Sequence, residues 1–99
     1  MNTTNYIAII EDGGTTHATG VWFPDLPGCL SAGDTLDEAI SNATEILDEW
    51  AIILAEDGKA MPPPRTLTQL KSDPEVAAEI AQYMVAVIPL LSGQRRAAA

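Results

Sequence analysis

Basic residues are missing from more than half of this 99-residue chain. Residues 1–58 contain no lysine or arginine, whereas acidic residues recur throughout that span. Such a negative surface repels phosphate backbones and speeds encounter with a basic protein, by up to about 10³-fold in well-focused cases at low salt. The basic residues further along the chain are few and scattered, so direct nucleic-acid binding is not expected. A simpler explanation of the same negative charge is that it serves only to keep the protein soluble.

Residues for redox, metal, catalytic and export functions are also scarce. Cys29 is the only cysteine and has no His or Cys at metal-ligand spacing, so we expect it to be a small buried residue. His17, the only histidine, has no serine or cysteine partner at a spacing typical of a general base. No long uncharged apolar run or leader pattern is present. The sequence therefore predicts a cytoplasmic protein without cofactor, metal or membrane contact, which is not an enzyme.

Three short strands are expected ahead of a long helix. Residues 5–10 and 16–23, joined by a glycine-containing turn, predict a β-hairpin, and residues 29–32 predict a third strand. Trp22 and Phe23 are neighbours in the second of these strands, so they point to opposite faces of the sheet. We expect one of the two aromatic side chains to be exposed for a partner.

The most strongly patterned segment is a predicted helix over residues 36–56. Thr35 and Glu38 have the spacing of a capping box at its start, and Gly58 suits its C-terminal cap. At about 1.5 Å per residue, this helix would be about 31 Å long. One face is continuously apolar and is expected to pack on the sheet. Its residues are Leu36, Ala39, Ile40, Ala43, Leu47, Trp50, Ala51 and Leu54.

The opposite face of the predicted helix carries carboxylates with no cation at i,i+4 spacing. We call this set the acidic rib, and its members are Glu38, Glu45, Glu49 and Glu56, with Asp37 and Asp48 beside them. A solvated helix face usually alternates charges of both signs, which support one another locally. The rib therefore indicates either a docking surface for a basic partner or a solvated face.

The remaining segments predict a stiff connection and a last strand. Residues 62–64 are three prolines, and residues 72–75 begin a short second helix that reaches Gln82 and serves as a connector. Residues 83–88 form an apolar run, which is typical of a strand that is buried on both faces or paired inside a sheet. The order β-β-β-α-(short α)-β predicts an α+β fold with one long helix on an antiparallel-rich sheet.

The segment from Phe23 to Ala39 closely resembles the signature of HicB-type antitoxins. It combines Pro24, Pro27 and Gly28 with a strand and a capped helix start, and in that family such a segment links the third strand to the long helix. The acidic glycine turn at residues 11–14, the segment after the long helix and the closing strand also match. The resemblance covers nearly the whole chain to about Leu91 and implies a partial ribonuclease-H-like fold.

The resemblance implies an antitoxin that neutralises a small basic HicA-like toxin. Toxins of this family resemble double-stranded-RNA-binding domains and cleave messenger RNA, so an acidic domain would cover the surface that RNA phosphates need. We select six partner-binding residues, namely Asp25, Asp37, Glu38, Glu45, Glu49 and Trp22. A homodimer or higher homo-oligomer is also expected, formed through the apolar closing strand or an exposed aromatic side chain.

One departure from the family and two rival functions stay open. HicB proteins commonly continue into a DNA-binding module, whereas we expect residues 1–91 to form the toxin-neutralising domain and residues 92–99 a flexible tail. This puts autoregulation in doubt. The chain could instead be a stand-alone regulatory or protein-binding domain with no toxin. A degenerate nuclease is disfavoured, because residues 6–10 lack the carboxylate that a two-metal site needs on its first strand.

Overall fold

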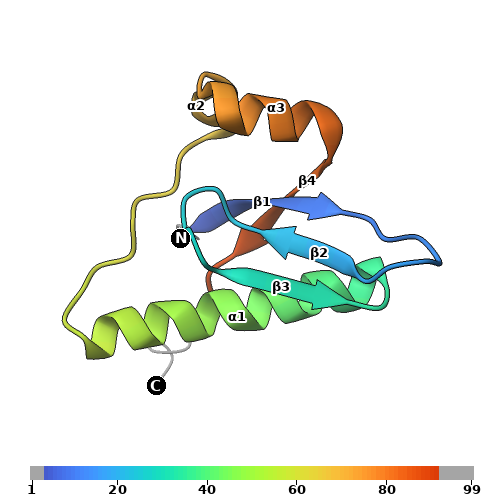
Figure 1. The fold of residues 1–99 in the computed structure, drawn as a ribbon. Helices are drawn as coiled ribbons and strands as arrows, with labels where there is room; N and C mark the ends of the chain where they lie inside the picture. The colour runs from blue at the N-terminus through green and yellow to red at the C-terminus, as the bar shows by residue number, and fades with distance from the viewer. Residues whose placement is uncertain (1–3, 92–99) are drawn as a thin grey trace.

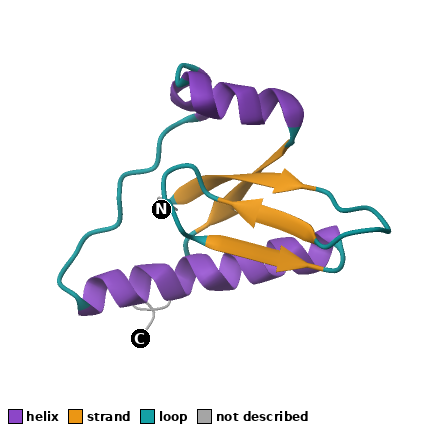
Figure 2. Cartoon of the chain, viewed as in Figure 1, coloured by secondary structure: helices purple, strands orange, loops and turns teal. Residues whose placement is uncertain are grey.

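The computed structural model describes residues 4–91 and has the α+β architecture expected from the sequence (Figures 1 and 2). The predicted tail, residues 92–99, lies outside the described residues. One antiparallel sheet has the strand order β3-β2-β1-β4. Its strands are β1 (Asn5–Glu11), β2 (Thr19–Trp22), β3 (Leu30–Gly33) and β4 (Met84–Pro89). The helices are α1 (Leu36–Glu56), α2 (Leu67–Lys71) and α3 (Pro74–Gln82).

Helices cover both faces of this sheet (Figure 1). Side chains alternate along a strand, and Tyr6, Ala8 and Ile10 of β1 lie in the core cluster that contains the buried face of α1. Ile7 and Ile9 point the other way and pack with the layer formed by α2 and α3. β1 therefore contributes to a core on each side of the sheet.

The predicted packing face of α1 is confirmed in its central part. Ala39, Ala43 and Leu47 are fully buried and follow one another at four-residue intervals, so they form one row against the sheet. Further side chains pack partly buried beside this row, namely Leu36, Ile40, Ile46 and Trp50. The two alanines leave room for the helix backbone to approach the strands closely.

Both ends of α1 lie where their local signals place them. The Thr35 hydroxyl accepts a hydrogen bond from the Glu38 N–H at 3.1 Å. The Glu38 carboxylate accepts from the Asp34 N–H at 3.0 Å, one residue earlier than in a standard capping box. Gly58 follows the last turn with a φ of 73°, and the Lys59 N–H donates back to the helix at 2.8 Å. Glycine takes this left-handed conformation without a Cβ penalty.

The prediction of a solvent-exposed aromatic side chain on the second strand is wrong. Phe23 is 2% exposed in the core beneath α1, and Trp22 is partly buried on the opposite face. The Trp22 Nε1–H donates to Glu79 of α3 at 3.2 Å, and its ring meets Tyr83 edge-on with centroids 5.3 Å apart. α3 is therefore a packing layer as well as a connector, and this second layer is what covers Trp22.

The prediction that the last strand is buried on both faces is also wrong. β4 lies at the edge of the sheet and pairs only with β1. Ile88 is 1% exposed and faces α1, whereas Val85 is 37% and Val87 62% exposed on the other face. A continuous apolar run does not distinguish a central strand from an edge strand, because strand order depends on which distant segments pair.

Two smaller differences concern the length of the second strand and an additional short helix. The second strand is shorter than expected, because residues 12–18 form a loop whose turn is closed by hydrogen bonds from Thr16 and His17 to the Gly13 carbonyl. The five-residue α2 was not expected; Thr66 and Gln69 form a capping box at its start. Such a single turn lacks the periodic pattern by which longer helices are predicted.

Gly33 supplies the first testable prediction, because a Cβ at this position would lie 2.5 Å from the Ala39 nitrogen in the α1 backbone. A backbone atom cannot move aside as the end of a side chain can, so we expect Gly33→Ala to lower the free energy of unfolding by about 1–3 kcal/mol. Urea titration followed by circular dichroism measures this. Gly20→Ala is the matched control, since nothing lies within 4 Å of its Cβ position. Equal midpoints for the two variants would contradict the close approach.

Candidate partner-binding surface

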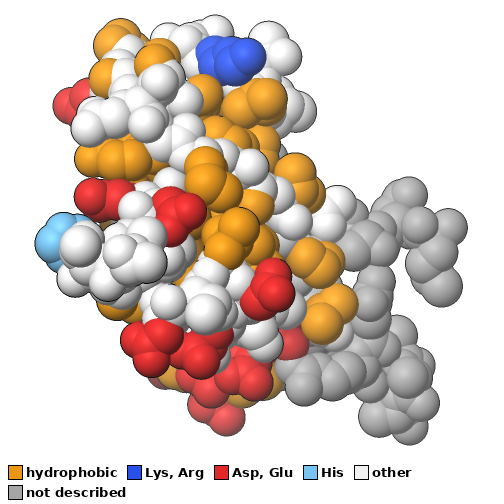
Figure 3. Space-filling view, turned by 90° about the vertical axis from the view of Figure 1, so that its right-hand side faces the viewer, with side chains coloured by type: hydrophobic (Ala, Val, Ile, Leu, Met, Phe, Trp, Pro, Cys, Tyr) orange, Lys and Arg blue, Asp and Glu red, His pale blue; other side chains and the backbone are white. Residues whose placement is uncertain are grey.

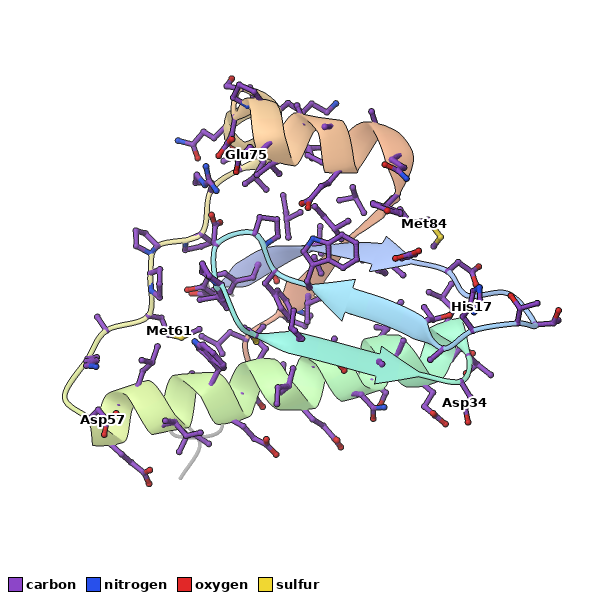
Figure 4. All side chains as sticks on the ribbon, viewed as in Figure 1. His17, Asp34, Asp57, Met61, Glu75 and Met84 are labelled. Atoms are coloured by element: carbon purple, nitrogen blue, oxygen red, sulfur yellow. The ribbon has the colours of Figure 1, made fainter. Side chains whose placement is uncertain are left out.

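The acidic rib is a row of exposed carboxylates on the face of α1 opposite its packing row. Figure 4 shows acidic side chains that point away from the sheet along α1, between the labelled Asp34 and Asp57 at its two ends. Figure 3 shows acidic side chains gathered at the end of the molecule that α1 occupies. The exposed members are Asp37, Glu38, Glu45, Glu49 and Glu56.

Glu45 and Glu49 lie one helical turn apart at the centre of this row. Among residues 4–91, no hydrogen bond or ion pair to either carboxylate is present. Glu38 differs, because its carboxylate is engaged by the Asp34 N–H at the helix start. Like charges at i,i+4 destabilise a helix by about 0.2–0.5 kcal/mol. A cationic partner would relieve that repulsion.

Ile53 adds an apolar group to this surface that the sequence analysis did not single out. Its side chain is 57% exposed, and it lies four residues after Glu49, on the neighbouring turn of α1. An exposed aliphatic residue among carboxylates combines apolar contact with charge attraction. Helical periodicity could have revealed it, since Ile53 falls outside the predicted packing face.

Asp48 does not belong with the rib. It is 5% exposed, and its Oδ1 accepts a hydrogen bond from the Leu91 N–H at 2.9 Å. The chain after β4 therefore lies against this side of α1. The expectation that Asp48 is a solvent-facing neighbour of the rib is wrong, because residues 43 positions apart meet there.

Asp25 is held inside the chain by Arg65. Its side chain is 8% exposed and accepts from the Arg65 backbone N–H at 2.7 Å and from the Arg65 Nε–H at 2.6 Å. The Arg65 Nη1–H also donates to Asp73, the N-cap of α3, at 3.1 Å. The network joins the β2–β3 loop to the segment before α2 and to α3. Asp25 thus has an internal ionic partner in this structure.

A second contact anchors the proline-rich segment that runs from α1 to α2. The buried Tyr6 hydroxyl donates to the Pro62 carbonyl at 2.5 Å, and Met61 packs against the core beneath the sheet. Figure 4 shows Met61 on this segment as it passes between α1 and the upper layer. Burial raises the pKa of the Tyr6 hydroxyl, so it stays a hydrogen-bond donor.

The Arg65 network predicts a defined response to acid. The hydrogen bond from Arg65 lowers the pKa of Asp73 below its ordinary value of 3.8. A carboxyl whose pKa is lower in the folded state stabilises the fold above its ordinary pKa, and this stabilisation is lost as the pH falls through the folded value. We therefore expect Asp73→Asn to be less stable than the wild type near pH 6, with the difference shrinking as the pH falls below 3.8.

Thermal melting from pH 6 to pH 2 measures this response. Asparagine caps a helix about as well as aspartate. The variant therefore removes the charge of residue 73 but keeps a side chain that can cap the start of α3. Melting temperatures that differ by the same amount at every pH would contradict the assignment of the effect to ionised Asp73.

The remaining histidine and cysteine of the described chain lie in different surroundings. No three His, Cys, Asp or Glu side chains in the described part of the chain are arranged to hold a metal ion. His17 is exposed in the β1–β2 loop, as Figure 4 shows. Cys29 is fully buried, as expected, and burial raises the pKa of its thiol to about 11. No helix within residues 4–91 is both long and apolar enough to cross a bilayer.

Comparison with solved structures identifies antitoxins of the same architecture. The crystal structure of the Burkholderia pseudomallei antitoxin HicB superposes with a TM-score of 0.68 and 27% sequence identity, over 89% of this chain and 62% of that one. The HicA3 and HicB3 toxin–antitoxin complex contains a chain that matches with a TM-score of 0.67 and 25% identity, over 88% of this chain and 98% of that one.

Sequence comparison gives a consistent result. An uncharacterized 14.9 kDa protein from the rep-hol intergenic region of Haemophilus phage HP1 is 42% identical over 52 residues, which cover 52% of this chain and 39% of the phage protein. This match therefore spans less than half the length of that relative. The family model described as the HicB-like antitoxin of bacterial toxin–antitoxin systems matches residues 6–97. The chain belongs to this HicB-like antitoxin family, as the resemblance in its sequence predicted.

Proposed function

We propose that this chain binds a small basic HicA-like toxin through the acidic rib of α1 and thereby covers the toxin surface that binds RNA. The observation that carries the proposal is the row of exposed carboxylates at Glu45 and Glu49, which have no cationic partner among residues 4–91. Family membership and the likeness to a chain of the HicA3 and HicB3 toxin–antitoxin complex support a toxin as the partner.

The rib suits this role because the helix that carries it is packed on the sheet. The row Ala39, Ala43 and Leu47 fixes α1 on the sheet, so the carboxylates on the far side keep their spacing before a partner arrives. A preorganised surface loses less conformational entropy on binding than a flexible one. Complementary charge also accelerates encounter and selects against acidic partners.

We refine the set of residues proposed to contact the toxin according to their exposure. Asp37, Glu38, Glu45 and Glu49 are exposed on α1, and we add Ile53 as an apolar contact. Asp25 and Trp22 have partners within the chain, so in this proposal they support the fold around the surface. A toxin lysine or arginine that binds between Glu45 and Glu49 would no longer be free to bind an RNA phosphate, because the two carboxylates would take the place of the phosphate.

The mode of action follows from the same surface. We propose inhibition by occupation without catalysis, in the cytoplasm, where the toxin would meet messenger RNA. We also propose that the antitoxin self-associates as a homodimer or higher homo-oligomer. The ribonuclease-H-like relationship of the fold and the lack of direct nucleic-acid binding stay predictions.

Co-expression tests the function. We expect the small basic protein encoded beside this chain to arrest growth when it is expressed alone, and this chain to restore growth and co-purify with it. If the basic protein is not toxic, or if it stays toxic and does not co-purify, the antitoxin proposal is wrong. A stand-alone regulatory domain of the same fold would then be the better account.

A further inference from the structure

The layer formed by α2 and α3 is joined to the rest of the molecule at two anchored positions. Before it lies Arg65, whose backbone N–H and Nε–H both donate to the Asp25 carboxylate, at 2.7 and 2.6 Å. After it, β4 begins at Met84, which pairs with Ile10 of β1. Figure 1 shows both helices on one side of the sheet and α1 on the other. Residues 66–82 thus lie between two positions that are fixed to the remainder of the fold.

The apolar core that holds this layer is small. Its buried members are Ile9 of β1, Leu70 of α2 and Val76 of α3, and the side chains around them are only partly buried. The cluster on the opposite face of the sheet has eleven buried members within the described chain. Hydrophobic stabilisation is roughly proportional to the apolar area removed from water. The sheet therefore holds α2 and α3 more weakly than it holds α1.

Neither helix of the layer is long enough to be stable away from the sheet. α2 has five residues and α3 has nine. Isolated helices shorter than about 12–15 residues are marginal in water. α1 differs, because it has 21 residues and a cap at each end. Separation of α2 and α3 from the sheet therefore also unfolds them, so the two helices are lost together in one step.

Two side-chain contacts to α3 supplement the apolar core of the layer. The Arg65 Nη1–H donates to the Asp73 carboxylate at the start of α3, at 3.1 Å. The Trp22 Nε1–H donates to Glu79 in the middle of α3, at 3.2 Å. Arg65 and Asp73 are both partly exposed, and ion pairs in contact with solvent add little stability. The two contacts thus fix the position of α3 on the sheet without binding it tightly.

The layer covers part of an apolar row that crosses three strands. Ile9 of β1 pairs with Trp22 of β2 and with Val85 of β4, so these three side chains share one face of the sheet. Ile9 is fully buried and Trp22 is partly buried, whereas Val85 is 37% exposed. In the next row on this face, Ile7 pairs with the exposed Val87. Without the layer, the covered part of the row would join the part that is already exposed.

We propose that residues 66–82 form a lid that opens and closes as one unit while the sheet and α1 stay folded. In the open form both helices unfold, the two side-chain contacts to α3 break, and the apolar row of Trp22, Ile9 and Val85 faces solvent. Proteins open locally in contiguous cooperative units, with free energies below that of global unfolding. The lid therefore controls the exposure of this face of the sheet.

The acidic rib keeps its place in the open form, because α1 packs on the other face of the sheet. The lid does not depend on the antitoxin role, and its test needs no toxin. Failure of toxin capture would leave the lid unaffected, and failure of the lid to open would leave the proposed toxin contact unaffected.

Hydrogen exchange of the purified full-length chain at increasing, sub-denaturing urea tests the lid in the wild type. The urea dependence of an opening reaction scales with the surface that the opening exposes. We expect the slowest amides of α2 and α3 to exchange at least about tenfold faster, relative to their intrinsic rates, than those of α1 and β1. Their urea dependence should also be smaller. Equal relative rates and equal urea dependence in all four elements would overturn the proposal, since the chain would then open only as a whole.

Leu47→Ala and Leu70→Ala are a matched pair of variants for the same measurement. Both leucines are fully buried, Leu47 in the core beneath α1 and Leu70 in the core of the lid. Leu47 stays packed when the lid opens. We therefore expect Leu47→Ala to accelerate exchange in α1 by about 30-fold or more, and exchange in α2 and α3 by a much smaller factor. Leu70→Ala should accelerate exchange in α2 and α3 by about 30-fold or more, because Leu70 loses its burial on opening.

Two results with these variants would overturn the lid. One is acceleration of α1, α2 and α3 by the same factor in Leu47→Ala, which would mean that they unfold together. The other is unchanged exchange in α2 and α3 of Leu70→Ala, which would mean that their amides exchange by local fraying. Circular dichroism checks that each variant is folded. The exchange pattern of the wild type decides the question by itself if Leu47→Ala does not fold.

Discussion

Replacing Glu45 and Glu49 together with lysine is expected to abolish capture of the HicA-like toxin while the fold stays intact. Both side chains are exposed, and neither makes an ion pair among the described residues, so their loss removes no internal contact. Leaving a desolvated interface charge without its partner costs about 2–5 kcal/mol, which is roughly 30-fold to several thousand-fold in affinity. Reversal adds repulsion to that loss.

Isothermal titration with purified toxin measures the effect, and growth after co-expression reports it in cells. Glu75→Lys is the control matched in charge to each of the single variants Glu45→Lys and Glu49→Lys, because Glu75 is also an exposed glutamate but lies on α3, in the opposite layer (Figure 4). We expect this control to retain the affinity of the wild type to within a few-fold. Equal loss in the double variant and the control would point to net charge, and no loss in either would mean that the rib serves only solvation.

Truncating Phe23 to alanine is expected to give the largest loss of stability. Phe23 is 2% exposed in the core between the sheet and α1, together with Leu26 and Tyr6. Removal of a buried phenylalanine ring costs about 3–5 kcal/mol, because the lost transfer energy is joined by a cavity that neighbouring atoms fill only in part. A domain of this kind has only about 5–15 kcal/mol in total.

Urea denaturation of the two variants Phe23→Ala and Leu30→Ala measures this difference. Leu30 is 65% exposed at the β3 edge, so its truncation should change the free energy of unfolding by no more than about 0.5 kcal/mol. Similar midpoints for the two variants would show that Phe23 is not part of a packed core.

The features of the fold that were predicted correctly depend on residues that are close together in the sequence. Thr35, Glu38 and Gly58 bound α1 through contacts within one helical turn, which a sequence displays directly. The buried row of α1 follows from the same short-range periodicity. The second helical layer was missed because the pattern of α3 shows that it has an apolar side but not which surface that side covers.

The residues of the candidate site likewise fall into two groups, those that local spacing predicts and those that depend on distant contacts. Helical spacing places Glu45 and Glu49 on the solvent face of α1, and the structure has them there. The partners of Asp25 and Asp48 lie 40 and 43 residues away in the chain. No local pattern identifies such contacts, so two carboxylates that look alike in the sequence serve the interior of the fold instead of its surface.

Displacement of RNA from the basic toxin tests the central claim most directly. A labelled RNA bound to a catalytically inactive toxin would be titrated with this chain at low and at moderate salt. If the acidic rib covers the RNA-binding surface, the RNA is released in proportion to the antitoxin added, and the antitoxin affinity falls as salt screens the contact. Formation of a ternary complex, in which toxin holds RNA and antitoxin at once, would contradict it.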